Sequence, residues 1–387
     1  MYVIPQNIYS VTNFLVWMRD KKYACSMMHT FKTHGERKAM ANSVEKKDID
    51  WTALGFAYTQ CDYSYVAHYK DGAWDEGGLT TDHSITLSEC ANIFHYCQEV
   101  FEGLKAYTTV SGDIVCFRPN LNAQRMVDSA SRLVMPPFPE DRFVAAVKEV
   151  VSANAAWVPP FGTGATLYVR PFMIGTGNTV GVKPSPTYEF RIMVTPVGAY
   201  YSNGVAPVAL TVSPYDRAAP HGTGNIKAGL NYAMSLYPTT WAHEQGFADS
   251  MYLDSGSRTY VEESSGANFL FVDKEGTLVI PQSYTDSILP SITRRSLATV
   301  AKDLLGMKVV ERPVRFDELD QFVECGMCGT AAVISPVGKV VDGQKEIVFG
   351  AGMEAVGPVM SKLRNTLTSI QSGEIEAPEA DWICKIC

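Results

Sequence analysis

Residues 221–232 read His-Gly-Thr-Gly-Asn-Ile-Lys-Ala-Gly-Leu-Asn-Tyr. Three glycines within eight positions make a loop whose backbone can approach a ligand closely. The apolar run from Leu230 has helical spacing, so Lys227 stands where the loop becomes a helix and Tyr232 lies about one turn into it. A lysine amine in an apolar, glycine-lined site can lose its proton and attack a carbonyl, giving a Schiff base. The alternative is a solvated lysine in a turn, and the window lacks the glycine patterns of phosphate-loop and dinucleotide-binding motifs.

Further segments in the same chain support the first interpretation because they occur together in a fixed order. They lie at 101–107 (Phe-Glu-Gly-Leu-Lys-Ala-Tyr), 118–122 (Arg-Pro-Asn-Leu-Asn), 168–171 (Tyr-Val-Arg-Pro), 289–294 (Leu-Pro-Ser-Ile-Thr-Arg) and 329–331 (Gly-Thr-Ala). With the Lys227 segment they resemble the branched-chain amino-acid aminotransferases, fold-type-IV enzymes that use pyridoxal 5'-phosphate. The resemblance runs from about residue 50 to the C-terminus. It implies an α+β, two-domain chain like D-amino-acid aminotransferase, with the cofactor between the domains, and a homodimer.

Composition agrees with a globular chain of two domains, since 387 residues are 46% hydrophobic and 19% charged. The net charge of −8 makes nucleic acid or an anionic membrane an unexpected partner. No apolar run approaches the roughly 18 residues of a membrane span. Nine scattered cysteines indicate reduced thiols in an intracellular protein. The pairs Cys325/Cys328 and Cys384/Cys387 are too far apart in sequence for the usual zinc motif, and we expect no metal.

The order of the chain predicts four parts. Residues 1–50 form an N-terminal extension, 51–200 a small α/β domain, 201–206 an interdomain linker, and 207–387 a large domain that carries Lys227. Strands are expected near 63–69, 115–118, 166–170, 188–194, 208–212, 250–253, 260–263, 268–272 and 278–280. Helices are expected from Asn120, over 140–156, from Leu230 with an end or kink at Pro238, and from about Ser291. We expect the cytoplasm; a mitochondrial presequence is the alternative, although acidic residues near the N-terminus count against it.

Pyridoxal phosphate needs an amine for its aldehyde, an anion near its ring nitrogen, a phosphate cradle and a partner for its phenolic oxygen. Lys227 is the candidate amine, and Tyr232 is the candidate partner of the phenolic oxygen. Strand alternation puts Glu262 and Glu263 on opposite faces, so we expect only one of them to point inward. The family pattern Glu-x4-Asn, which ends here at Asn268, implies Glu263. Without the resemblance, two solvated carboxylates on an edge strand are the simpler interpretation.

The helix start at Ile292 and Thr293 offers backbone N–H groups that favour a phosphate. From the helix pattern alone, Arg125 is a solvated charge, but the resemblance places it on the cofactor phosphate, where a guanidinium can donate two charge-assisted hydrogen bonds. Arg217 is a weaker candidate for a second cation. Thr330 is assigned to both cofactor and substrate.

The substrate α-carboxylate is expected at the turn 329–331, where the N–H groups of residues such as Thr330 and Ala331 form an anion-binding nest. The resemblance places the substrate side chain among four aromatic residues, for each of which core packing is the alternative: Tyr96, Phe101, Tyr168 and Tyr200. Arg170 is the candidate for the distal carboxylate of glutamate or 2-oxoglutarate. An aromatic wall with a polar end suits both kinds of substrate.

These residues predict transfer of the amino group of L-leucine, L-isoleucine or L-valine to 2-oxoglutarate by a ping-pong cycle, in which Lys227 moves the α-proton. The alternatives are an aminodeoxychorismate lyase or a D-amino-acid aminotransferase of the same fold, and a binding protein without activity. The sequence leaves open which amino acid is preferred and whether the role is biosynthetic or catabolic. Mammalian relatives carry a redox Cys-x-x-Cys after the Thr-Ala turn; here Ala332 and Ser335 stand there, so that switch is expected to be absent.

Overall fold

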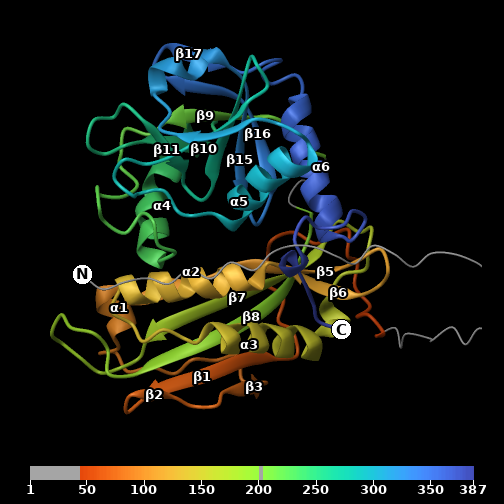
Figure 1. Ribbon diagram of the computed structural model, residues 1–387. Coiled ribbons are helices and arrows are strands. Elements are labelled where there is room, and N and C mark those ends of the chain that lie inside the picture. The colour runs from red at the N-terminus through yellow and green to blue at the C-terminus, as the bar shows by residue number, and fades with distance from the viewer. Residues whose placement is uncertain (1–43, 200–203) are drawn as a thin grey trace, which may run out of the picture. The chain divides into compact units, whose positions relative to one another are not determined.

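The computed structural model describes residues 44–199 and 204–387. Most of the predicted N-terminal extension, the candidate Tyr200, and residues 201–203 of the predicted linker lie outside these ranges. Two β-sheets organise the described part, with helices packed against each (Figure 1). The mixed α+β character predicted from the sequence is therefore present.

In the first sheet, all neighbouring strands run antiparallel, in the order β18-β6-β5-β7-β8-β1-β2, with β3 beside β1 and β4 beside β7. Its strands are β1 (Ser64–Lys70), β2 (Ala73–Trp74), β3 (Gly78–Thr80), β4 (Glu99–Phe101), β5 (Leu104–Thr108), β6 (Ile114–Phe117), β7 (Thr166–Gly175), β8 (Tyr188–Val197) and β18 (Ile383–Lys385). The accompanying helices are α1 (Asn92–Tyr96), α2 (Pro119–Arg132), α3 (Glu140–Ala153) and the short 3₁₀ turn η1 (Ala155–Trp157).

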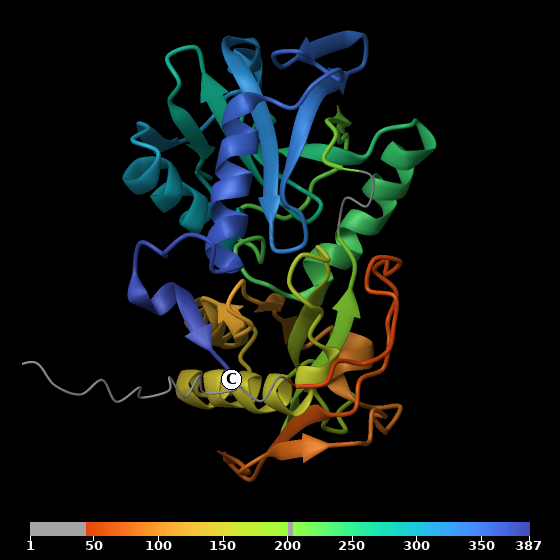
Figure 2. The same cartoon turned by 90° about the vertical axis from the view of Figure 1, so that its right-hand side faces the viewer.

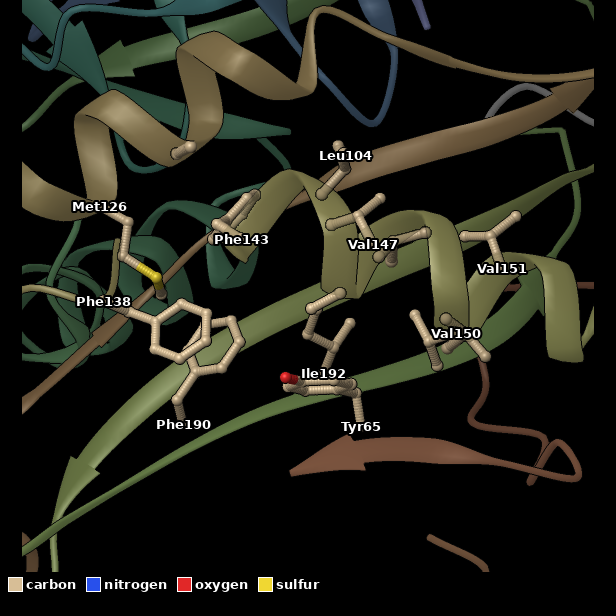
Figure 3. Close-up of a cluster of buried hydrophobic side chains, with 14 of the residues drawn as sticks. Tyr65, Leu104, Met126, Phe138, Phe143, Val147, Val150, Val151, Phe190 and Ile192 are labelled. Atoms are coloured by element: carbon tan, nitrogen blue, oxygen red, sulfur yellow. The ribbon is translucent and has the colours of Figure 1, made fainter. Parts of the chain in front are cut away.

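One face of this sheet is covered by α3, whose apolar residues recur at helical spacing. Figure 3 shows Phe143, Val147, Val150 and Val151 of this helix pointing at the sheet, where they belong to one buried cluster with strand residues such as Ile192. Leu104, Leu167 and Val169 also point into this cluster.

Because strand side chains alternate between faces, the residues between those core positions emerge from the opposite face. These are Glu99 and Phe101 of β4, Lys105 of β5, and Tyr168 and Arg170 of β7. One face of the sheet thus makes a core, and the other presents polar and aromatic groups to the rest of the chain.

The last strand, β18, pairs with β6 and so returns to the first sheet (Figure 2). The sequence pattern placed everything from 207 to the C-terminus in one domain. The predicted domain boundaries stay predictions, but this strand belongs by its hydrogen bonds to the sheet of residues 64–197.

The second sheet has the order β11-β10-β9-β16-β15-β12-β13-β14, and a further pairing of β11 with β12 closes a ring of strands. Its strands are β9 (Val208–Val212), β10 (Asp249–Leu253), β11 (Val261–Ser264), β12 (Asn268–Asp273), β13 (Leu278–Pro281), β14 (Val309–Arg312), β15 (Phe322–Gly329), β16 (Val333–Asp342) and β17 (Lys345–Val348), which pairs with β16. Large apolar side chains such as Phe269 and Phe271 are fully buried there.

Three helices accompany this second sheet: α4 (Gly229–Glu244), α5 (Ile292–Thr299) and α6 (Pro358–Gln371). A π-helical turn η2 (Val300–Leu304) extends α5, and the 3₁₀ turns are η3 (Phe316–Gln321) and η4 (Ala380–Trp382). Of the two outcomes expected at Pro238, an end of the helix is wrong, since α4 continues to Glu244, and a kink stays a prediction. Proline removes one backbone donor, and the turns on either side still carry the helix.

Within residues 44–199 and 204–387, no helix combines the length and the apolar character needed to cross a membrane.

Candidate active site

Lys227 lies just before α4, as the glycine-rich loop predicted. Its Nζ donates a hydrogen bond of 2.6 Å to the hydroxyl of Tyr232, one turn into the helix. The amine also lies 4.6 Å from the ring centroid of Phe101 and 4.8 Å from that of Tyr232. The two rings contact each other edge to face, with centroids 4.9 Å apart. The structure therefore brings the predicted amine, its predicted phenol and one predicted pocket aromatic together.

The backbone of Lys227 is held by the first sheet and its helices rather than by its own loop. Its N–H donates to the Ser129 hydroxyl on α2 at 2.9 Å, and its carbonyl accepts the Phe101 N–H at 3.1 Å. Ser129 was not predicted from the sequence, because a serine inside a helix carries no signal of a partner almost a hundred residues away. These two hydrogen bonds fix the position of the Lys227 backbone relative to α2 and β4.

Glu263 lies in β11 directly opposite Asn268 in β12, which explains the Glu-x4-Asn spacing physically. The Asn268 amide donates to the Glu263 carboxylate at 2.8 Å, the Leu289 N–H donates at 2.9 Å, and the Arg217 guanidinium contacts it at 2.6 Å. Burial raises the pKa of the Glu263 carboxyl, while the Arg217 charge and the Leu289 N–H oppose the rise. A buried carboxylate with these donors is suited to hold a proton on a nearby ring nitrogen.

Arg217 has a different role from the second phosphate cation considered above. Besides Glu263, its guanidinium donates to the carbonyl of Gly224 at 2.8 Å and to that of Ser287. It thereby ties the carboxylate to the loop that carries Lys227.

The simpler interpretation of Glu262 and Glu263 as two solvated carboxylates on an edge strand is wrong, since β11 pairs with both β10 and β12 and both side chains are buried. They leave β11 on opposite faces, yet their exposed fractions are 2% and 3%. The ring of strands buries one face of β11, and the 283–287 loop covers the other, where Ser287 donates to Glu262. Burial alone therefore does not select Glu263, and its choice stays a prediction that rests on its partners.

The predicted phosphate cradle lies at the start of α5. Ser291 caps this helix, since its hydroxyl accepts the Arg294 N–H at 3.2 Å. Ile292 and Thr293 are buried in the first turn, where N–H groups have no partner within the helix. Both the cap and the anion site predicted from the sequence are compatible with this geometry.

Arg125 is not the solvated charge of the simpler interpretation, nor is it a free cation. It is buried, and its Nε and one terminal nitrogen donate to both oxygens of Glu102 at 2.8 and 2.7 Å. The other terminal nitrogen donates to the Pro290 carbonyl at 3.2 Å, beside the start of α5. Burial opposes the charge of Arg125, but Glu102 keeps its pKa raised. Arg125 thus stays cationic next to the predicted cradle.

Glu102 itself was not singled out from the sequence, where it is only part of a quoted segment. It is fully buried, and the Asn122 amide also donates to it at 2.7 Å. A carboxylate flanked by apolar residues that are expected to be buried is the available signal, because a buried charge requires a partner.

On the substrate side, Tyr168 and Arg170 emerge from the same face of β7. A terminal nitrogen of Arg170 donates to the Tyr168 hydroxyl at 2.9 Å, and its guanidinium lies 4.9 Å from the Phe101 ring centroid. A side chain at Gly103 would overlap the Tyr168 hydroxyl and so would displace the Tyr168 side chain from this position. These contacts place two of the four predicted aromatics, Phe101 and Tyr168, and the predicted polar end Arg170 in one cluster with Lys227.

The turn between β15 and β16 is hydrogen-bonded to β5 and to the residue just before it. Thr330 donates through its hydroxyl to the Gly103 carbonyl at 3.3 Å, and the Lys105 Nζ donates to the Ala331 carbonyl at 2.7 Å. Lys105, another residue that was not singled out from the sequence, is 8% exposed. Burial and the nearby Arg364 charge lower its pKa to about 8. The Ala331 carbonyl thus faces this amine, and the binding of an anion by the N–H groups of the turn stays a prediction.

Two predicted substrate residues are not joined to this cluster. The Tyr96 hydroxyl donates to the Val180 carbonyl, and its nearest described ring is His95, 6.2 Å away. Tyr200 lies outside the described residues. Both assignments stay predictions.

Cys325 and Cys328 are three residues apart on β15 and therefore point to opposite faces. They belong to separate buried clusters, and burial raises the pKa of both thiols, that of Cys328 to about 12. This geometry agrees with the expectation of plain thiols rather than a redox pair.

Comparison with known proteins extends these observations. The sequence matches the amino-transferase class IV family over residues 99–340. It is 51% identical over 345 residues to the branched-chain-amino-acid aminotransferase of Haemophilus influenzae, covering 88% of this chain and 99% of the relative. Identity to the Helicobacter pylori enzyme of the same name is 43%, over 88% of this chain and 98% of the relative.

Solved structures of the same kind also superimpose on the chain. The branched-chain amino acid aminotransferase of Escherichia coli has a TM-score of 0.68 at 28% identity, covering 84% of this chain and 99% of that one. The Thermobaculum terrenum enzyme of the same name, in its PLP-bound holo form, has a TM-score of 0.69 at 25% identity, covering 85% of this chain and 99% of that one.

Proposed function

The chain belongs to the branched-chain aminotransferases within the class IV aminotransferase family, and on this premise we propose that it transfers the amino group of L-leucine, L-isoleucine and L-valine to 2-oxoglutarate. The products are the branched-chain 2-oxo acids and L-glutamate. The observation that supports this most directly is the Lys227–Tyr232 hydrogen bond above the Phe101 ring, in a chain that is 51% identical to such an enzyme. The lyase and the D-amino-acid aminotransferase are not favoured.

Pyridoxal 5'-phosphate is the cofactor, and the residues present fit it. When bound, it would supply a protonated ring that delocalises the electron pair left on the substrate α-carbon after the α-proton is removed. We assign Glu263 to the ring nitrogen, Tyr232 to the phenolic oxygen, and the first turn of α5 with Arg125 to the phosphate. The helix N-terminus and the guanidinium both favour a doubly charged anion. Thr330 borders this cradle.

Lys227 is the acid–base group of the proposed reaction. Its Nζ, when unprotonated, accepts the α-proton of the substrate and later returns a proton. The Tyr232 hydroxyl and the backbone bonds from Ser129 and Phe101 hold that amine in place. Because these contacts hold the amine in one orientation, the side chain need not sample other rotamers before each proton transfer. This preorganisation raises the rate of the transfer.

The substrate is held at its two ends. The N–H groups of Thr330 and Ala331 take the α-carboxylate, and the side chain lies on Phe101 and Tyr168, where the aromatic rings exclude water. Arg170 takes the distal carboxylate of glutamate or 2-oxoglutarate. Tyr96 and Tyr200 are assigned to the outer part of this pocket by resemblance.

A homodimer is part of the proposal. Phe94 in α1 and the loop residues Val180 and Val182 have exposed fractions of 61%, 83% and 86%. Apolar side chains this exposed on neighbouring segments mark a protein interface. Sedimentation of the purified protein should give twice the mass of the chain, and replacing Val180 and Val182 by Asp should give monomers.

The proposed compartment is the cytoplasm, with the mitochondrial matrix as the alternative. The eight cysteines in the described ranges are free, as expected where thiols stay reduced. Fractionation of the source cells distinguishes the two compartments.

The activity is tested with purified protein supplied with pyridoxal phosphate. The visible absorption of the bound cofactor should change on adding L-leucine and not on adding D-alanine, and 2-oxoglutarate should then restore it with release of L-glutamate. A response to D-alanine alone would contradict the proposal. Lys227→Ala, which we expect to fold normally, is the matched control and should give no response.

A further inference from the structure

The short strand β4 carries two residues on the face that looks toward Lys227. Glu99 and Phe101 alternate to the same side, and their partners across β7 are Ile174 and Phe172. Arg170 is on that same face of β7, two residues from Phe172. The Phe101 ring lies within 4.6 Å of the Lys227 amine and 4.9 Å of the Arg170 guanidinium.

The Glu99 carboxylate reaches across to the start of α4. It accepts the Gly229 N–H at 2.8 Å, two residues after Lys227. The residue at the N-cap position, Ala228, has no side chain that can do this. A side chain at Gly229 would overlap the carboxylate, so glycine is needed for the contact. One acidic group from the first sheet thus sits between the helix that carries Tyr232 and the cations of the site.

The charge of this carboxylate acts on the site. Burial raises the pKa of the Glu99 carboxyl, while the Gly229 N–H and the charges of Arg170 and Lys227 oppose that rise. Glu99 is not in hydrogen-bond contact with Arg170 among the bonds described for residues 44–199 and 204–387. Glu99 and Arg170 therefore share one face of the sheet, with Phe101 in contact with Arg170, and the Glu99 carboxylate acts on the Arg170 charge without occupying its donors.

The proposed reaction requires one pocket to bind both a charged and an uncharged substrate side chain. Arg170 must accept a distal carboxylate from glutamate, yet must also tolerate an uncharged leucine side chain in the same pocket. A partly buried guanidinium beside an apolar side chain is unfavourable unless another anion balances it.

We propose that Glu99 is a specificity-determining residue, whose carboxylate balances Arg170 while a branched-chain substrate is bound and disfavours the distal carboxylate of glutamate. This inference rests on the proposed function and deepens it. With leucine bound, Glu99 supplies the missing anion. With glutamate bound, two carboxylates share one guanidinium, so glutamate binding is weakened and its release as a product is favoured.

The test separates the charge of Glu99 from its hydrogen bond to Gly229. Glu99→Gln keeps an oxygen that accepts the Gly229 N–H but removes the charge, whereas Glu99→Ala removes both. The holoenzyme is mixed with L-leucine or with L-glutamate, and kcat/KM is obtained for each from the absorbance change of the bound cofactor. Glu149→Gln, on the exposed side of α3, is the control for loss of an acidic group elsewhere.

In Glu99→Gln we expect the preference for leucine over glutamate to fall at least about fivefold, a coupling of roughly 1 kcal/mol. The change should appear as a higher KM for leucine and a lower KM for glutamate, with kcat nearly unchanged. Glu99→Ala should in addition lower kcat for both substrates, because α4 loses its contact. Glu149→Gln should behave as wild type.

An unchanged leucine-to-glutamate ratio in Glu99→Gln would overturn the inference while leaving the proposed function intact, and it can arise in two ways: both kcat/KM values stay at the wild-type level, or both fall by the same factor. An equal fall would mean that Glu99 acts only through the position of α4. A wild-type protein that reacts with neither amino acid would instead overturn the proposed function.

Discussion

Replacing Arg125 by alanine should destabilise the protein even when no cofactor is present. The substitution removes two charge-assisted hydrogen bonds to Glu102 and leaves that fully buried carboxylate, among the residues that the structure describes, with only the Asn122 amide as a side-chain donor. Breaking a buried ion pair by deleting one partner costs about 3–5 kcal/mol. We therefore expect the free energy of unfolding of the cofactor-free protein to fall by about that amount. Cofactor affinity should fall at least about tenfold as well, from the lost phosphate contact.

The assay is urea unfolding of cofactor-free protein, followed by fluorescence. Glu102→Gln in the Arg125→Met background removes the stranded charge, so this double variant should recover more than half of the lost stability while cofactor affinity stays weak. Dialysis of the loaded double variant measures that affinity separately. A loss below about 1 kcal/mol in Arg125→Ala, the value of an exposed pair, would refute the buried-pair argument. Unchanged cofactor retention would refute the phosphate role.

Further predictions concern Gly229, Lys105 and Lys227. Gly229→Ala should lower kcat by at least about tenfold, because overpacking of about 1–3 kcal/mol displaces Glu99 and the start of α4, and adding Glu99→Ala should restore part of the rate in the same kinetic assay. Burial lowers the pKa of Lys105 from 10.5 to about 8, so the folded state binds fewer protons than the unfolded state between these pH values. Stability relative to Lys105→Met should therefore rise with pH across that window, by up to about 3 kcal/mol in urea titrations, and a flat difference would contradict the assignment. Lys227→Ala should abolish turnover and shift the free energy of unfolding by less than about 1 kcal/mol, which urea titration of the same preparation checks.

Local patterns were sufficient for much of the fold. The apolar spacing in 140–156 predicted α3, which spans Glu140–Ala153, and the alternating strands around 166–170 and 188–194 correspond to β7 and β8. The resemblance supplied the arrangement, and the two-domain, fold-type-IV α+β architecture is confirmed by the structures it matches. The return of β18 to the first sheet was not predictable, because a three-residue strand is too short to show an alternating pattern, and its sequence does not indicate which strand it pairs with.

For the site, sequence reasoning worked where the partners are close in the chain. Lys227 and Tyr232 are five residues apart at a helix start, and Glu263 faces Asn268 across a tight hairpin. It failed where a buried charge is met by a distant one. The Glu102–Arg125 pair joins the connection between β4 and β5 to helix α2, and nothing in either segment alone specifies that pairing.

The same limit explains the other residues that were missed. Lys105 and Glu99 act on the turn at Ala331 and on Gly229, which lie 226 and 130 positions away in the chain. Lys105 and Glu99 reach these partners because both project from the face of the first sheet that is opposite its hydrophobic core, which is a property of the folded sheet and not of the local sequence.

The proposed chemistry depends most on Lys227 being the amine that carries the cofactor, with Lys105 as the informative competitor because its pKa of about 8 also makes it a good nucleophile. Borohydride reduction of the loaded protein, followed by digestion and mass spectrometry, identifies the lysine that becomes covalently labelled. We predict a single phosphopyridoxyl group on the peptide containing Lys227. A label on Lys105, or on any lysine other than Lys227, would contradict the central claim.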